Sequence, residues 1–139
     1  MSGKDHKVAA LLEGVETGLH DPHFAGYFRC FNEQKFYEAH DVLEALWLQD
    51  RNGPDGDFFK GLIQFAGALV HLQKKRPRPA RNLFRLCTIY LAKYPSPHLA
   101  LDVANVLRLA KRWGEAAQIL GSEGDLLAGQ SPPTRRLQT

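Results

Sequence analysis

A stripe of polar residues and one glycine runs along an otherwise apolar stretch near the middle of the chain. Lys60, Gln64, Gly67 and His71 follow one another in steps of three or four residues. At about 100° per residue of an α-helix, these positions fall within an arc of about 60°. Because a buried polar group without a partner costs on the order of 1–3 kcal/mol, the pattern predicts partners for this stripe on a neighbouring element.

The expected partners stand on the preceding helix. His40, Glu44 and Trp47 lie along one edge of that helix, and His40 and Glu44 are four residues apart, so their side chains can touch. An antiparallel pair of helices would bring this edge against the polar stripe. On the same helical wheel Asp41 points further toward solvent and Glu38 lies on the opposite flank, so we expect both outside the cluster.

Three interpretations of this cluster are open. The first is a structural network, in which Glu44 pairs with Lys60 or His40 and the remaining stripe residues complete the hydrogen bonds. The second is a metal site made of His40, Glu44 and His71, which the charge of Lys60 would oppose. The third is a metal-free ligand or catalytic pocket, in which His40 is the general acid or base, Glu44 orients it, and Lys60 or Gln64 binds an anion or a carbonyl.

Two more residues bear on the pocket interpretation. Gly67 costs about 1 kcal/mol relative to alanine inside a helix, which predicts that a backbone, a water or a ligand approaches closely there. Trp47 would either wall such a pocket or belong to the core. No serine or cysteine adjoins the cluster in sequence to act as a nucleophile. Both an enzyme and a binding module are therefore open, and apart from the metal interpretation we expect no cofactor.

Helical periodicity runs along the chain, and no strand-like alternation interrupts it. Clusters of Gly and Pro, such as residues 52–56, separate the periodic segments. We therefore predict an all-α, single-domain bundle of five or six helices, with the helix at 57–75, which is apolar nearly all round, at its centre. The expected helices span residues 7–19, 22–32, 35–50, 57–75, 79–93 and 97–120.

Residue types at the helix ends support these boundaries. Asp21 is an N-cap candidate before a proline, and Ser96 is another before Pro97. Asn32 tolerates the left-handed conformation that ends many helices. Residues 1–6 and 121–139 are expected to be disordered, the latter because they are rich in Gly, Ser and Pro and poor in large apolar side chains.

Composition restricts the class of protein. With 44% hydrophobic residues the chain can bury a core, and the only cysteines, Cys30 and Cys87, are expected to be small buried hydrophobes without a disulfide. The start lacks the apolar region of a signal peptide, and no apolar run is long enough to span a membrane. We expect a soluble cytoplasmic protein whose partners and oligomeric state are unknown.

Charge is distributed unevenly. Residues 1–60 hold 6 basic and 11 acidic side chains, whereas residues 74–112 hold 10 basic side chains and one acidic side chain. A basic region of this kind can meet phosphates, so nucleic-acid binding is an alternative. It predicts that Arg78, Arg81 and Arg85 share one exposed face with the basic cluster at 108–112. It fails if these arginines pair instead with the acidic half.

Two segments make the chain resemble a known family. The run FNEQKFYEAHDVLEALW, residues 31–47, is similar to the hallmark stretch of the domain-of-unknown-function family numbered 309, and so is FKGLIQFAGALVH, residues 59–71. The resemblance implies a small helical bundle with no established activity. Carried over by position, the polar motif residues here are Glu38, His40, Asp41, Glu44, Gln64 and His71.

The chain departs from that family's pattern at three places. Asp41 stands where Glu is usual, Lys60 stands where Gln is frequent, and Asn32-Glu33-Gln34 replaces a turn that usually contains Gly. The positive charge of Lys60 weakens the metal interpretation. The sequence thus predicts a helical bundle whose polar cluster is a structural network in a binding or interaction module. The alternatives are a ligand-binding or hydrolytic pocket, with or without a metal, and nucleic-acid binding through residues 74–112.

Overall fold

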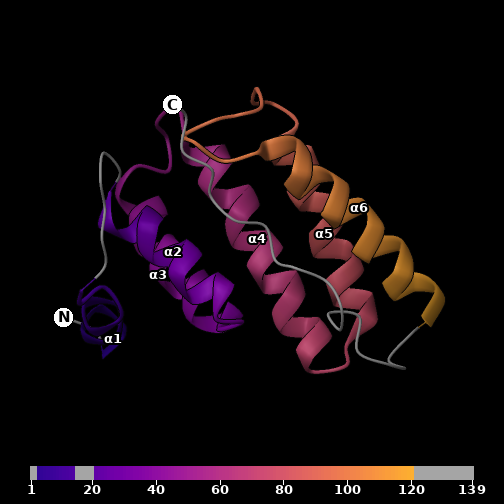
Figure 1. Cartoon of the computed structure of the whole chain (residues 1–139), viewed down its shortest axis with the longest axis horizontal. Helices are drawn as coiled ribbons and strands as arrows, with labels where there is room; N and C mark the ends of the chain where they lie inside the picture. The colour runs from indigo at the N-terminus through magenta and orange to yellow at the C-terminus, as the bar shows by residue number, and fades with distance from the viewer. Residues whose placement is uncertain (1–2, 15–20, 121–139) are drawn as a thin grey trace.

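The computed structural model describes residues 3–14 and 21–120, which form six α-helices and, apart from an isolated bridge between His98 and Leu101, no β-structure. The predicted all-α bundle is therefore confirmed (Figure 1). The helices are α1 (Gly3–Leu11), α2 (Pro22–Asn32), α3 (Phe36–Gln49), α4 (Gly56–Gln73), α5 (Pro77–Leu91) and α6 (Val103–Leu120).

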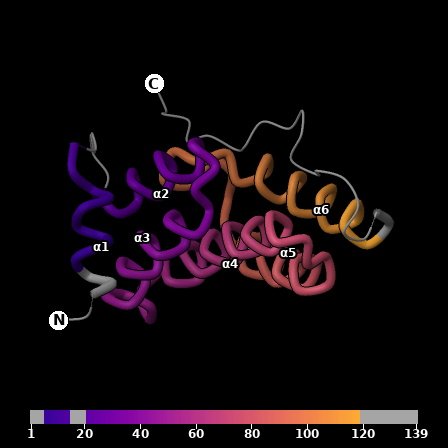
Figure 2. Tube along the Cα trace, turned by 90° about the horizontal axis from the view of Figure 1, so that it is seen from below, coloured from indigo at the N-terminus to yellow at the C-terminus, as the bar shows by residue number. Residues whose placement is uncertain are grey.

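The helices form two layers, with α4 at the centre as predicted. Helices α3, α4 and α5 lie side by side, while α2 and α6 lie across one face of them (Figure 2). Phe58 and Phe65 on that face of α4 pack against aromatic rings of α2 and α6. The Tyr27 hydroxyl of α2 donates a hydrogen bond of 2.7 Å to the carbonyl of Leu62. The core therefore lies between the two layers.

The first helix is shorter and begins earlier than expected. It runs over Gly3–Leu11 instead of residues 7–19, so it includes part of the segment expected to be disordered. Gly14 has a φ of 73°, a left-handed conformation that terminates helices, and this stops a periodicity that continues in the sequence. Residues 15–20 and the expected tail, 121–139, lie outside the described residues.

The second helix begins and ends where the sequence predicts. The Asp21 side chain accepts a hydrogen bond of 2.7 Å from the backbone N–H of His23. The helix ends at Asn32, but Asn32 is not the left-handed residue. That conformation belongs to Gln34, which has a φ of 61°, because the backbone reverses two residues beyond the helix end.

Gln34 is therefore a position where glycine should stabilise the fold. A left-handed conformation costs an L-residue about 1–2 kcal/mol, whereas glycine adopts it freely at some cost in entropy. We expect Gln34→Gly to raise the free energy of unfolding by about 0.5–1 kcal/mol in urea titrations. Glu33, with a φ of −88°, supplies the control, because Glu33→Gly should not stabilise. Equal effects of the two changes would contradict the strain argument.

The last helix begins later than expected. Ser96 and Pro97 do not open it, because residues 97–102 form a loop in which Leu99 and Ala100 have positive φ. Asp102 caps the helix by accepting a hydrogen bond of 3.1 Å from Asn105 N–H. Ser96 still takes part, because its hydroxyl accepts one of 3.0 Å from Ala104 N–H. The helix then continues through Gly114 to Leu120, as expected.

The expectation that both cysteines are buried and free is confirmed. Cys30 and Cys87 are free and buried, and burial raises the pKa of the Cys87 thiol strongly, as expected for an inert core residue. Trp113 is a core residue. None of the described helices combines the length and the apolar character that crossing a membrane requires.

Candidate functional site

The predicted polar stripe was expected to be buried, but it is the least buried side of α4. Lys60, Gln64, Gly67 and His71 are only half-buried, whereas most other positions of this helix are buried. The stripe faces away from α2 and α6, which cover the opposite side of α4. We call these four residues, together with His40, Glu44 and Trp47 of α3, the polar face.

The predicted antiparallel pairing of α3 and α4 assembles the polar face. Trp47 lies beside Lys60, whose Nζ is 5.6 Å from the centre of the indole ring. His40, seven residues before Trp47 on α3, lies beside Gly67, which is seven residues after Lys60 on α4. The His40 Cδ2 is 3.9 Å from the place that a Cβ on Gly67 would take. The two helices therefore run in opposite directions, in the register that the pattern requires.

Gly67 is the floor of the polar face. A Cβ at this position would lie 3.3 Å from Leu83 Cδ1 of α5, in addition to its contact with His40. The expected close approach at Gly67 is thus made by side chains of both neighbouring helices. A larger residue here would push α3 and α5 apart.

His40 is held between two carboxylates of its own helix. Its Nδ1 lies 3.3 Å from Asp41 Oδ1, and its Nε2 lies 3.9 Å from Glu44 Oε2. The side chains of His40 and Glu44 are 32% and 28% exposed. The predicted contact between them is present, but Asp41 is the nearer partner.

Asp41 is buried, which corrects the expectation that it points toward solvent. Its side chain is 7% exposed and its Oδ2 accepts a hydrogen bond of 3.3 Å from Lys7 Nζ. The helical wheel failed here because α1 packs on this side of α3 and covers it. Glu38, the other motif residue placed outside the cluster, is half-buried on α3.

The Lys60 ammonium lies between two aromatic rings. Its Nζ is 5.6 Å from the ring centre of Trp47 on α3 and 5.1 Å from that of Tyr90 on α5. Attraction between the charge and the two π faces accounts for a lysine at this half-buried place. Lys60 thus joins the three helices at one end of the polar face.

Two polar atoms of the polar face have no hydrogen-bond partner in the described part of the chain. They are Gln64 Oε1 and His71 Nδ1, and both are buried at the atomic level. Burial lowers the pKa of His71, and the nearby charges of Arg76 and Lys74 lower it further. His71 is therefore mostly neutral at neutral pH, and hydrogen bonds among the described residues alone do not complete the predicted network.

The proposed metal ligands are not brought together. Within residues 3–14 and 21–120, no group of three His, Cys, Asp or Glu side chains is placed to hold a metal ion. His71 lies one helical turn beyond Gly67, about 6 Å further along α4 than the residue that His40 contacts. The His40–Glu44 pair thus lacks the third ligand that the sequence suggested.

The basic region is exposed, as the nucleic-acid alternative requires. Arg78, Arg81 and Arg85 of α5 are exposed, and so is Arg112 of α6. An ion pair does link this region to the acidic half, because Lys93 Nζ lies 2.7 Å from Asp57 Oδ2. The three arginines of α5 form no such pair with the described residues.

One polar cluster was not predicted. His98 Nε2 lies 2.7 Å from Asp55 Oδ1, and the Tyr94 hydroxyl accepts a hydrogen bond of 3.0 Å from Phe58 N–H. The same hydroxyl donates to the Pro54 carbonyl at 2.8 Å. These contacts fasten the loop between α5 and α6 to the start of α4. Their partners are about 40 residues apart, so no local spacing could have indicated them.

Comparisons with known proteins agree with the resemblance seen in the motifs. Residues 24–83 match the family described as Domain of unknown function (DUF309), a stretch that contains the polar face. An uncharacterised protein of Aquifex aeolicus (strain VF5) is 25% identical over 77 residues, which cover 55% of this chain. The match spans about a quarter (23%) of that relative's length. No solved structure matches the chain.

Proposed function

We propose that this chain, whose residues 24–83 match the DUF309 family, is a binding module that holds a short peptide along the polar face. The observation that supports this proposal is the pair of unpaired polar atoms, Gln64 Oε1 and His71 Nδ1. A buried polar atom that stays without a partner costs on the order of 1–3 kcal/mol. A ligand that pairs with both atoms recovers this free energy as affinity.

The spacing of the two atoms favours a peptide. Gln64 and His71 are seven residues apart on α4, which corresponds to about 10 Å along the helix. Three residues of extended peptide span a similar distance, about 10 Å. The N–H of a peptide group can donate to Gln64 Oε1. Neutral His71 can either donate or accept at Nδ1, so a peptide C=O or N–H can pair with it. A small rotation of the two side chains would present both atoms to such a ligand.

The surroundings of His40 favour binding over catalysis. Both ring nitrogens face carboxylates of the same helix, Asp41 at 3.3 Å and Glu44 at 3.9 Å. A general base needs a nitrogen directed at the proton that it abstracts. We therefore propose that His40 lines the binding site and that its two carboxylate neighbours fix its orientation.

A substitution at Gln64 separates this proposal from a structural network. We expect Gln64→Leu to raise the free energy of unfolding of the unbound protein by about 1 kcal/mol, because it removes an unpaired buried oxygen. We also expect it to abolish peptide binding. The probe is an equimolar mixture of N-acetyl tripeptide amides, followed through the backbone amide NMR signals of Gln64, Gly67 and His71. Stability is measured by urea unfolding.

Gln73 on the same helix provides the matched control, because its Nε2 already donates a hydrogen bond of 3.1 Å to the Gln34 carbonyl. Gln73→Leu should lower stability slightly and leave the peptide response unchanged. If Gln64→Leu lowers stability by as much as or more than Gln73→Leu, the polar face is a structural network. If the tripeptides shift no signal of the wild-type protein, the peptide assignment is wrong.

A further inference from the structure

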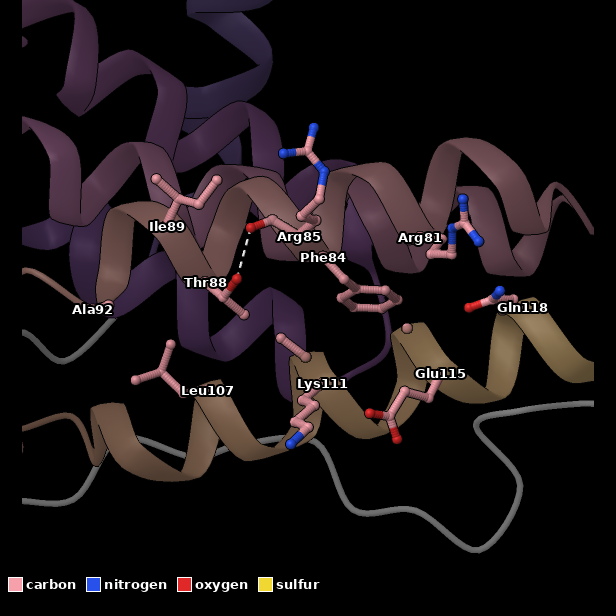
Figure 3. A pocket seen from close by; sticks show the side chains of 12 residues that line it. Arg81, Phe84, Arg85, Thr88, Ile89, Ala92, Leu107, Lys111, Glu115 and Gln118 are labelled. Atoms are coloured by element: carbon pink, nitrogen blue, oxygen red, sulfur yellow. Dashed lines mark hydrogen bonds between the residues drawn. The ribbon is translucent and has the colours of Figure 1, made fainter.

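A second surface of the protein is an open apolar groove between α5 and α6. It has a volume of about 640 Å³, and the buried ring of Phe84 extends beneath it from α5 toward α6 (Figure 3). Leu107, Ala110 and Gly114 of α6 line it opposite. Ile89 stands at its edge with 50% of its surface exposed. Ala110 and Gly114 have little or no side chain, so they leave space on this side of α6.

Positive charges border this apolar surface. Arg81 and Arg85 of α5 and Lys111 of α6 line the groove and are exposed, against the single carboxylate of Glu115. Arg85 donates a hydrogen bond of 2.9 Å to Asn82, and none of the three cations forms an ion pair with the described residues. Among the described residues nothing neutralises the rim, and a partner of opposite sign can complement its charge.

We propose that this groove docks an amphipathic helix of a partner protein whose apolar side chains are flanked by aspartate and glutamate. The groove is open along two neighbouring helices, so a third helix can place a row of apolar side chains against Ile89, Ala92 and Leu107. Acidic residues on its flanks would then meet Arg81 and Arg85. Apart from Arg81, the residues that line the groove lie outside residues 24–83, and none of them belongs to the polar face.

The apolar floor favours a helix over a nucleic acid. Single-stranded nucleic acids bind through a basic groove combined with exposed aromatic rings that stack on bases. The one aromatic ring that lines this groove belongs to Phe84, which is buried with 1% of its surface exposed. The experiment described next therefore includes a nucleic acid as a competing probe.

The test uses the full chain and a fluorescent synthetic helix of about fifteen residues, with leucines spaced at i, i+3, i+4 and i+7 and glutamates on both flanks. A matched helix has lysines in place of the glutamates, and a third probe is a single-stranded RNA. By fluorescence anisotropy, we expect the acidic helix to bind at least about tenfold more tightly than the lysine helix. We also expect Ile89→Asp to weaken binding of the acidic helix about tenfold.

Charge reversal inside and outside the groove gives the matched comparison. Arg81→Glu combined with Arg85→Glu should weaken binding of the acidic helix at least about tenfold. Arg108→Glu combined with Arg112→Glu changes the net charge equally at exposed positions that do not line the groove, and should have little effect. Equal weakening by both pairs would overturn the proposal, because net charge alone would explain it. Tighter binding of the RNA than of the acidic helix would also overturn the proposal. So would a lack of binding by every probe, which would mean that a second copy or another part of the chain covers the groove.

Discussion

Replacing Phe65 with alanine is expected to destabilise the protein by about 4 kcal/mol, a large share of the stability of an ordinary domain. Phe65 is completely buried in α4. Its ring stacks on Phe31 of α2 at 5.5 Å and on Trp113 of α6 at 5.8 Å, and meets the edge of Phe84 at 5.8 Å. The truncation would leave a cavity between the two layers that rigid neighbouring rings cannot fill.

Urea unfolding followed by circular dichroism measures this loss. Phe65→Leu keeps most of the volume and should cost much less. Tyr37→Ala is the surface control, because Tyr37 is 52% exposed, and should change stability by less than about 0.5 kcal/mol. A double-mutant cycle with Trp113→Ala should show coupling between the two rings. A cost below about 1 kcal/mol for Phe65→Ala would mean that the core does not depend on this stack.

The aromatic rings packed around Phe65 also indicate where the folded domain ends. The family match stops at residue 83, but the packing of Phe65 is completed by Phe84 and Trp113, which follow it. Removing residues beyond 83 would expose one side of a buried ring. We therefore expect the segment that matches the family to unfold together with α5 and α6 as one cooperative unit.

Most of the helical arrangement follows from periodicity in the sequence. The positions of Lys60, Gln64, Gly67 and His71 predicted one side of α4, and that side is the open one. Because the spacing of residues around a helix is fixed, local sequence is enough to define such a face. The antiparallel contact of this face with His40 then follows from the short connection between α3 and α4.

Features that depend on a third element could not be predicted in this way. Asp41 is buried only because α1 lies over it and supplies Lys7. The contact between His98 and Asp55 joins segments 43 residues apart. The groove between α5 and α6 depends on the distance between two helices, which Ala110 and Gly114 influence but do not determine by themselves. Helix faces are local properties, whereas burial and grooves are set by packing.

The second large effect is expected at Gly56, the first residue of α4. A Cβ on this residue would collide with the backbone carbonyl of Arg51, whose carbon would be only 2.8 Å away. Backbone atoms cannot rotate aside as the end of a side chain can, so Gly56→Ala must shift the turn between α3 and α4. We expect a loss of about 3 kcal/mol in the free energy of unfolding, measured by urea titration. Because this turn sets the register of His40 against Gly67, peptide binding at the polar face should weaken as well.

Gly114→Ala is the control, because the same substitution at this position should have the opposite effect on stability. Gly114 lies inside α6, and a Cβ there would meet Phe84 at 3.5 Å, an ordinary contact. Gly114→Ala should therefore stabilise the protein by about 0.5–1 kcal/mol through helix propensity alone. The same substitution, glycine to alanine, is thus expected to lower the free energy of unfolding at Gly56 through steric collision and to raise it at Gly114 through helix propensity. If Gly56→Ala stays within about 0.5 kcal/mol of the wild type, the turn is adaptable, and the register of the polar face must be held by helix packing instead.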